Sequence, residues 1–151
     1  MRIYFKTINS HIMLKLGGYI NILIAIVHII GLFWADKMFE VTGIGNDMRE
    51  LASIHSSLPY LLTILVAIAF FIFGLYGLSA ENRFRKLPFL KIGIFSIAGI
   101  YIFRGLGKLL FDTIRGTHST VETAYSLIAL IIGLLFLFGG LKKWSLVTKR
   151  K

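Results

Sequence analysis

The chain has 151 residues, of which 56% are hydrophobic and 16% charged, and its net charge is +10. A soluble domain of this size could not bury so much apolar surface, so the composition predicts a polytopic membrane protein with one domain over residues 1–151. The sequence has no cysteine, which excludes disulfides, thiolate nucleophiles and cysteine-based metal or iron–sulfur sites.

Four apolar runs follow a short basic lead, and each is long enough to cross a hydrocarbon core about 30 Å thick. Because these runs are continuous and lack the alternation of barrel strands, they predict helices. The first run is longer than a signal-peptide core and has no small-residue cleavage site, so we expect it to be retained. The predicted spans are residues 16–34, 58–78, 87–111 and 123–141.

The segments around the spans carry their own signals. Residues 1–15 are basic and partly apolar, which predicts a frayed lead resting on the membrane surface. Pro59 and Pro88 stand where a missing N–H does no harm, in the first turn of the second and third spans. Residues 46–56 begin with asparagine and have helical apolar spacing, which predicts a short amphipathic helix in the first long loop.

Lysine and arginine alternate between the connections. The lead carries +3, the 35–57 connection −2, the 79–91 connection +3, the 112–121 connection 0 and the tail from residue 142 +5. Basic loops remain in the cytoplasm, so we predict an inner-membrane protein with both termini cytoplasmic. The basic balance then reflects topology and anionic lipids, and it does not indicate nucleic acid as a partner.

Polar side chains gather toward the predicted outer membrane face. Counted inward from Asp36 and Asp112, His28 and Arg104 both lie about 12 Å deep, at about 1.5 Å per residue. Lys108 is one helical turn nearer the surface than Arg104. A cation at such a depth costs about 3 kcal/mol or more unless it has a partner, water or a path to the interface.

Helical spacing places these groups on shared stripes, which predicts an outward-opening polar pocket inside an all-α four-helix membrane bundle. The predicted floor is His28, Tyr101 and Arg104, and the predicted rim is Asp36, Lys108 and Glu122, with Glu40 as a further rim candidate. Of these, Asp36 and Glu40 are secondary ligand-binding candidates, as is Tyr125. The guanidinium of Arg104 and the ammonium of Lys108 would suit a phosphate or a carboxylate.

Each member also has a purely structural interpretation. Arg104 could form an ion pair with Glu122 or Asp36 that holds the helices in register, and Lys108 could extend to the interface. His28 could be a hydrogen-bonded packing residue, and a carboxylate at the start of a helix is stabilised by the helix dipole.

Cofactor sites find little support in the sequence. A haem held by His28 and His55 is disfavoured, because the two residues are about two turns apart in depth. The spacings typical of metal hydrolases, the serine nucleophile elbow and the glycine-rich phosphate loop are all missing from the sequence. We therefore predict no metal and no cofactor.

Three short motifs resemble small uncharacterised bacterial inner-membrane proteins with four spans. They are GLYGLS at residues 74–79, LPFL at 87–90 and YIFRGL at 101–106, against a family pattern of LYALSG, RLPLL and Y-x-x-RG. Tyr101 and Arg104 fall on the aromatic residue and the arginine of that pattern. The resemblance implies the four-span topology and no established activity.

Two better-known four-span families are also similar in part. RGLGKL at residues 104–109 resembles the Arg-Gly-rich span of DoxX-like proteins, although that motif usually lies in the first span. The MAPEG enzymes are small, basic and four-spanning, but SSLP at residues 56–59 lacks their Glu-Asn pair, which disfavours a glutathione site.

The sequence leaves two functions open. One is a non-enzymatic membrane protein that binds a lipid or a small anionic amphiphile, or that acts as a partner subunit or homo-oligomer. The other is a membrane-embedded enzyme acting on a lipophilic substrate, with His28 or Glu122 as acid or base and Arg104 holding an anionic group.

Overall fold

The computed structural model describes the backbone of residues 2–80, 85–116 and 119–148, and the side chains of residues 12–80, 85–116 and 119–145. Its elements are α1 (Arg2–Gly31), η1 (Leu32–Trp34), α2 (Ala35–Val41), α3 (Gly45–Ile54), α4 (Leu58–Ala80), α5 (Leu90–Arg115) and α6 (Thr120–Thr148). Four helical segments are long and apolar enough to span a membrane. The predicted all-α four-helix bundle is confirmed, and the chain is a multi-pass membrane protein.

The predicted helix bounds need three corrections. The helix of the first span begins at Arg2, so the lead is helical and not frayed, and Leu14 is fully buried in the core. Phe89 has a left-handed backbone with φ of 51°, so α5 begins at Leu90 and Pro88 stands outside it. A short helix that we did not predict, α2, follows the first span. The predicted amphipathic helix is present as α3.

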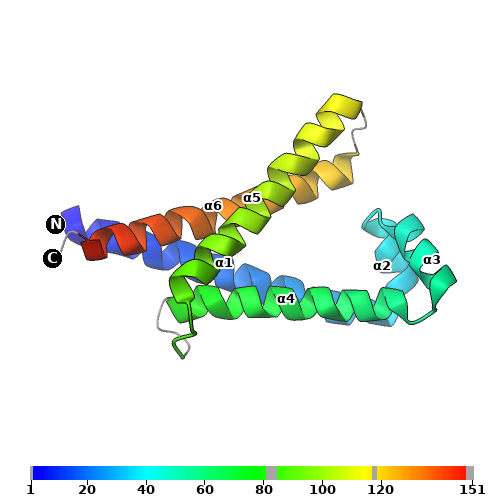
Figure 1. Cartoon of the computed structure of the whole chain (residues 1–151), viewed down its shortest axis with the longest axis horizontal. Helices are drawn as coiled ribbons and strands as arrows, with labels where there is room; N and C mark the ends of the chain where they lie inside the picture. The colour runs from blue at the N-terminus through cyan, green and yellow to red at the C-terminus, as the bar shows by residue number, and fades with distance from the viewer. Residues whose placement is uncertain (1, 81–84, 117–118, 149–151) are drawn as a thin grey trace.

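The helices form two hairpins that cross (Figure 1). One hairpin pairs α1 with α4 and the other pairs α5 with α6, while α1 also packs along α6. Both termini lie at one end, which we call the termini end, and α2 and α3 lie at the opposite end, which we call the α3 end. The hairpins diverge toward the α3 end.

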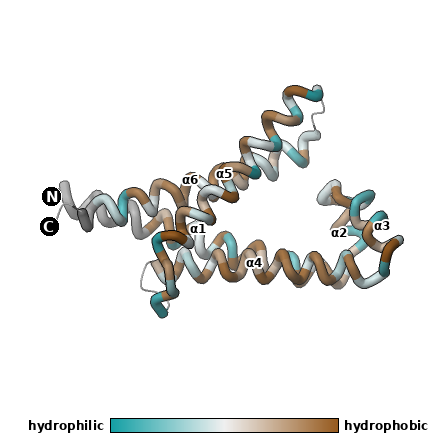
Figure 2. The backbone as a smooth tube through the Cα atoms, viewed as in Figure 1, coloured by the Kyte–Doolittle hydropathy of each residue, from teal (hydrophilic) through white to brown (hydrophobic). Residues whose placement is uncertain are grey.

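Apolar packing is concentrated on the termini side of the crossing. The core cluster there includes Leu14 from α1, Ile94 from α5, and Ile132 and Phe136 from α6. In Figure 2 hydrophobic colour runs along most of α4, whereas hydrophilic colour gathers on α3 and at the far tip of α5. The exposed apolar surface of the spans is the surface that lipid would cover.

Glycines set how closely each hairpin packs. A Cβ on Gly77 of α4 would lie 2.8 Å from the Cα of Gly18 on α1, and a Cβ on Gly105 of α5 would lie 2.8 Å from the Ser126 carbonyl oxygen on α6. Helices in lipid associate through such close contacts of small residues, because lipid tails remove the hydrophobic driving force between them.

Polar contacts hold residues 85–88, which precede α5, against the last turns of α4 at the termini end. The Ser79 hydroxyl donates to the Arg85 carbonyl oxygen at 2.8 Å and accepts from the Leu87 amide at 2.9 Å. The Tyr76 hydroxyl donates to the Pro88 carbonyl oxygen at 3.2 Å, and the Lys143 ammonium of α6 donates to the Ala80 carbonyl oxygen. These bonds satisfy backbone groups near the end of α4 and tie it to α6.

Candidate functional site

A buried hydrogen bond joins the two hairpins where they cross. The Tyr101 hydroxyl of α5 donates to Asn21 Oδ1 of α1 at 2.6 Å, and Asn21 Nδ2 donates to the Gly17 carbonyl oxygen at 2.8 Å. Asn21 is fully buried, and Tyr101 is 5% exposed. Because both polar groups are satisfied inside the bundle, this bond fixes the face of α5 that looks toward α1 and α4.

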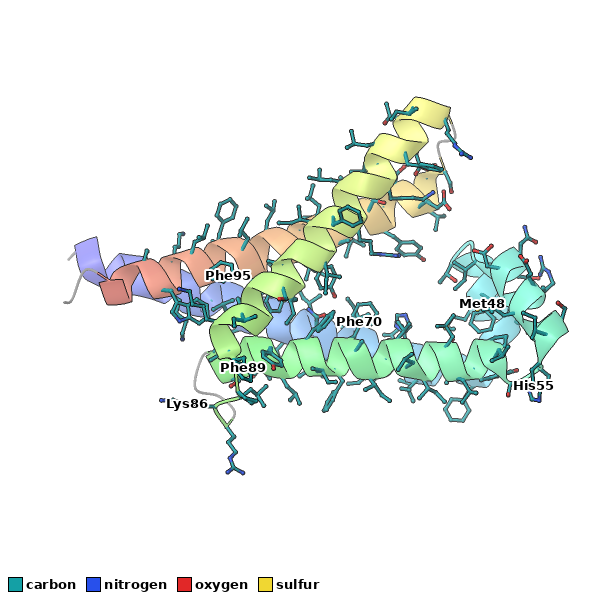
Figure 3. The ribbon with its side chains drawn as sticks, in the orientation of Figure 1. Met48, His55, Phe70, Lys86, Phe89 and Phe95 are labelled. Carbon is teal, nitrogen blue, oxygen red and sulfur yellow. The ribbon has the colours of Figure 1, made fainter. Side chains whose placement is uncertain are left out.

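An aromatic cluster continues from Tyr101 toward the α3 end. The centroid of the Tyr101 ring lies 6.4 Å from that of Phe70 and 6.2 Å from that of Phe73, both on α4. The His28 ring of α1 lies 5.2 Å from Phe70 on the same measure. In Figure 3 Phe70 lies on the side of α4 that looks toward the other hairpin, farther toward the α3 end than Phe89 at the start of α5. The His28 and Tyr101 rings thus both lie beside Phe70, one reaching it from α1 and the other from α5.

The hydrogen bond of His28 fixes its tautomer. Its Nδ1 lies 2.8 Å from the Ile24 carbonyl oxygen, which can only accept, so Nδ1 carries the hydrogen and Nε2 is the remaining acceptor. No carboxylate of the described residues is hydrogen-bonded to this ring. The imidazole therefore lacks the orienting acid partner that a general base commonly has.

Lys108 belongs to an ion-pair network at the far end of the α5–α6 hairpin. Its Nζ lies 2.8 Å from Asp112 Oδ1, one turn along α5, and 3.2 Å from Glu122 Oε2 on α6. Asp112 is 2% exposed, and its Oδ2 has no hydrogen-bond partner among the described residues. Two carboxylates thus neutralise Lys108, which leaves little capacity for the anion binding that we predicted for it.

Sequence reasoning missed Asp112 as a site residue and treated it as the edge of a loop. The spacing of Lys108 and Asp112 was the available signal, because residues four apart lie on the same face of a helix. Only the packing of α5 on α6 shows that Asp112 is buried and that Glu122 approaches from the other helix.

Arg104 differs from Lys108 in having no counter-ion. It is exposed, and it makes no hydrogen bond or ion pair with any residue in the described part of the chain. The predicted pairs with Glu122 and Asp36 are not formed, since Glu122 is held by Lys108. Arg104 stands three residues after Tyr101, so it lies near the face of α5 that looks toward α1 and α4.

The secondary candidates lie in separate places. Asp36 and Glu40 are on α2, at the end of the α1–α4 hairpin, and Glu40 faces Arg49 of α3 across 3.8 Å. Figure 1 shows this end well apart from the far tip of the α5–α6 hairpin, where Lys108 and Glu122 meet. Tyr125 is on α6 and is 40% exposed. The residues predicted to form one rim therefore lie in two separate groups. Asp36 and Glu40 belong to the α1–α4 end, and Lys108 and Glu122 belong to the α5–α6 hairpin.

Comparison with known proteins gives no assignment. No protein-family model, no curated protein and no solved structure matches this chain. Within the described residues, no group of three or more histidine, cysteine, aspartate or glutamate side chains is placed to hold a metal ion.

Proposed function

We propose that this chain is a membrane protein that binds an anionic amphiphile through Arg104, in the region where the two hairpins diverge. The observation that supports this proposal is the difference in ion pairing between Lys108 and Arg104, both on α5. Lys108 is neutralised by Asp112 and Glu122, whereas Arg104 has no partner among the described residues.

The depth of Arg104 supports an anionic ligand. Eight residues separate it from Asp112, which corresponds to about 12 Å along the helix at about 1.5 Å per residue. An unpaired guanidinium at that depth costs about 3 kcal/mol or more, which a phosphate or carboxylate would offset. The planar guanidinium can hold either group with two parallel hydrogen bonds.

The surroundings suit the apolar part of such a ligand. His28, Phe70 and Tyr101 form an aromatic cluster one turn or more below Arg104, and α4 makes few contacts with α5. A lipid chain lying between the diverging hairpins would meet rings and aliphatic side chains while its head meets Arg104. A ligand held in this way would have its head on Arg104 and its tail along the aromatic cluster.

We further propose that the chain lies in a bacterial inner membrane with both termini in the cytoplasm. The support is the charge alternation of the connections, since the basic segments fall at the termini end and the acidic segment at the α3 end. Arg104 would then lie in the outer leaflet. The structure gives the enzyme alternative no comparable support, because among the described residues the His28 imidazole is hydrogen-bonded only to Ile24 of its own helix.

A thermal-shift titration with short-chain lipids tests this function. Dioctanoyl phosphatidylglycerol should stabilise the wild-type protein more than dioctanoyl phosphatidylcholine, and Arg104→Ala should remove the difference. Arg104→Lys should retain part of it, because the charge remains and the two-pronged geometry is lost. Arg115→Ala is the matched control, since Arg115 lies on the same helix and stacks on Phe111 at 4.4 Å. Equal responses of Arg104→Ala and Arg115→Ala would overturn the proposal.

A further inference from the structure

A polar pocket lies at the α3 end, separate from Arg104. It encloses about 400 Å³ between α2, α3 and the first turn of α4, which is within the range of small-molecule sites. Its lining residues are Asp36, Phe39, Glu40, Gly45, Met48, Arg49, Ala52, Ser56, Pro59 and Tyr60. Figure 3 shows Met48 on α3 at this end of the molecule.

The backbone around the pocket is held by local hydrogen bonds and close packing. Gly43 turns the chain with φ of 81°, and the Ile44 amide donates to the Phe39 carbonyl oxygen at 3.0 Å. Gly45 is buried, and a Cβ there would lie 3.5 Å from the Glu40 Cα, so α3 packs directly on α2. Phe39 is 5% exposed and forms an apolar wall. The pocket is thus formed by packed elements and not by a loose loop.

The charges that line the pocket favour a cation. The pocket is lined by two exposed carboxylates, Asp36 and Glu40, and by one guanidinium, Arg49. Arg49 is already engaged, because its Nη2 donates to Asn46 Oδ1 at 2.6 Å and its Nη1 lies 3.8 Å from Glu40. Asp36 makes no hydrogen bond or ion pair with another residue in the described ranges. The lining residues therefore have a net charge of −1, and the Asp36 carboxylate has no partner among the described residues.

The rest of the lining narrows the kind of cation. Tyr60 and Phe39 contribute aromatic rings, and Met48, Ala52 and Pro59 contribute apolar surface. Aromatic faces attract ammonium groups, and apolar walls suit methyl or methylene groups attached to nitrogen. A bare metal ion would instead need several converging oxygen ligands.

We infer that this pocket binds an organic ammonium group through Asp36 and Glu40, against the ring of Tyr60. The group can belong to a lipid headgroup, because Tyr60 lies in the first turn of the candidate span Leu58–Ala80, or to a free amine in solution. The inference does not depend on Arg104, which lies on the other hairpin.

Binding to protein in lipid nanodiscs tests the inference. Choline is the soluble probe, followed by saturation-transfer NMR with discs of phosphatidylglycerol alone. We expect saturable binding to the wild type that is about tenfold weaker or more in Asp36→Asn, because the quaternary ammonium of choline loses the attraction of one of the two carboxylates. Asp47→Asn is the matched control, since Asp47 is an exposed carboxylate on α3 that does not line the pocket, and it should bind as the wild type does.

Discs that contain phosphatidylethanolamine distinguish the two sources of the ammonium group. Loss of choline binding in these discs would show that a lipid headgroup occupies the pocket, and undiminished binding would point to a free amine. Tyr60→Leu gives a second variant, and it should weaken choline binding with the melting temperature close to that of the wild type. The inference is wrong if the wild type binds no choline in phosphatidylglycerol discs, or if Asp36→Asn and Asp47→Asn bind it equally well.

Discussion

Replacing Lys108 with methionine should destabilise the α5–α6 hairpin, because it leaves the buried carboxylate of Asp112 without its cation. Lys108 Nζ is 2.8 Å from Asp112 Oδ1, and the Asp112 side chain is 3% exposed. Removing one partner of a buried ion pair costs about 3–5 kcal/mol. We take the lower end of this range as the cost of leaving Asp112 unpaired, because the Lys108 side chain is 39% exposed and water can reach that side of the ion pair.

The contact with Glu122 adds a smaller term. Glu122 Oε2 is 3.2 Å from Lys108 Nζ, and its side chain is 38% exposed. An exposed pair contributes about 1 kcal/mol at most. Lys108→Met should therefore lower the free energy of unfolding by about 3 kcal/mol, which is the cost of leaving the buried Asp112 carboxylate without its cation.

The double variant Lys108→Met/Asp112→Asn separates this cause from lost packing. It removes the cation and the buried anion together, so it should be more stable than Lys108→Met alone by about 2 kcal/mol. Unfolding by SDS in mixed micelles gives both values, and Lys91→Met, an exposed lysine in the first turn of α5, is the control. Two results would contradict this prediction: Lys108→Met no less stable than Lys91→Met, or the double variant no more stable than Lys108→Met.

Three further predictions concern the packing of the bundle. Tyr101→Phe keeps the ring and leaves Asn21 Oδ1 without its donor, so it should cost about 1 kcal/mol in the same unfolding assay, whereas Tyr125→Phe, at an exposed position, should cost nothing measurable. Gly105→Val should destabilise the protein by about 2 kcal/mol or more, because its Cβ would lie 2.8 Å from the Ser126 carbonyl oxygen. Gly99→Val should be tolerated, because a Cβ there has nothing within 4 Å. Equal effects of the two substitutions would contradict the close α5–α6 contact at Gly105. Ser79→Ala should speed hydrogen exchange at the Leu87 amide without changing exchange at Gly93, whose amide bonds to the Phe89 carbonyl oxygen; an unchanged rate at Leu87 would show that the Ser79 hydroxyl does not protect it.

The sequence was sufficient to predict the spans. Apolar length identifies them without knowledge of helix packing, so four long apolar helices and α3 are present as expected, although α1 begins at Arg2 and α6 ends at Thr148, outside the predicted 16–34 and 123–141. The start of α5 was harder to predict from the sequence, because Pro88 is compatible with the first turn of a helix. Only the left-handed backbone of Phe89 shows that the helix begins after it. The short helix α2 lacks enough residues for a periodic signal.

The rotation of α5 explains why the predicted pocket was only partly right. Spacings of three and four residues both lie near one helical face, so the sequence could place Tyr101 with either Arg104 or Gly105. In the structure Gly105 faces α6 at close range, which leaves Arg104 toward the edge of the interface. The same packing buries Asp112 beside Lys108. Sequence periodicity alone does not determine which of two adjacent stripes meets a neighbouring helix.

Mass spectrometry of the lipids that co-purify in mild detergent would test the role of Arg104 most directly. Wild type, Arg104→Ala and Arg115→Ala would be purified in parallel and their bound lipids compared at equal protein amounts. We predict one anionic lipid class that is enriched on the wild type and on Arg115→Ala, and that is depleted on Arg104→Ala. The same lipids in the same amounts on all three proteins would contradict the assignment of Arg104 as a ligand contact.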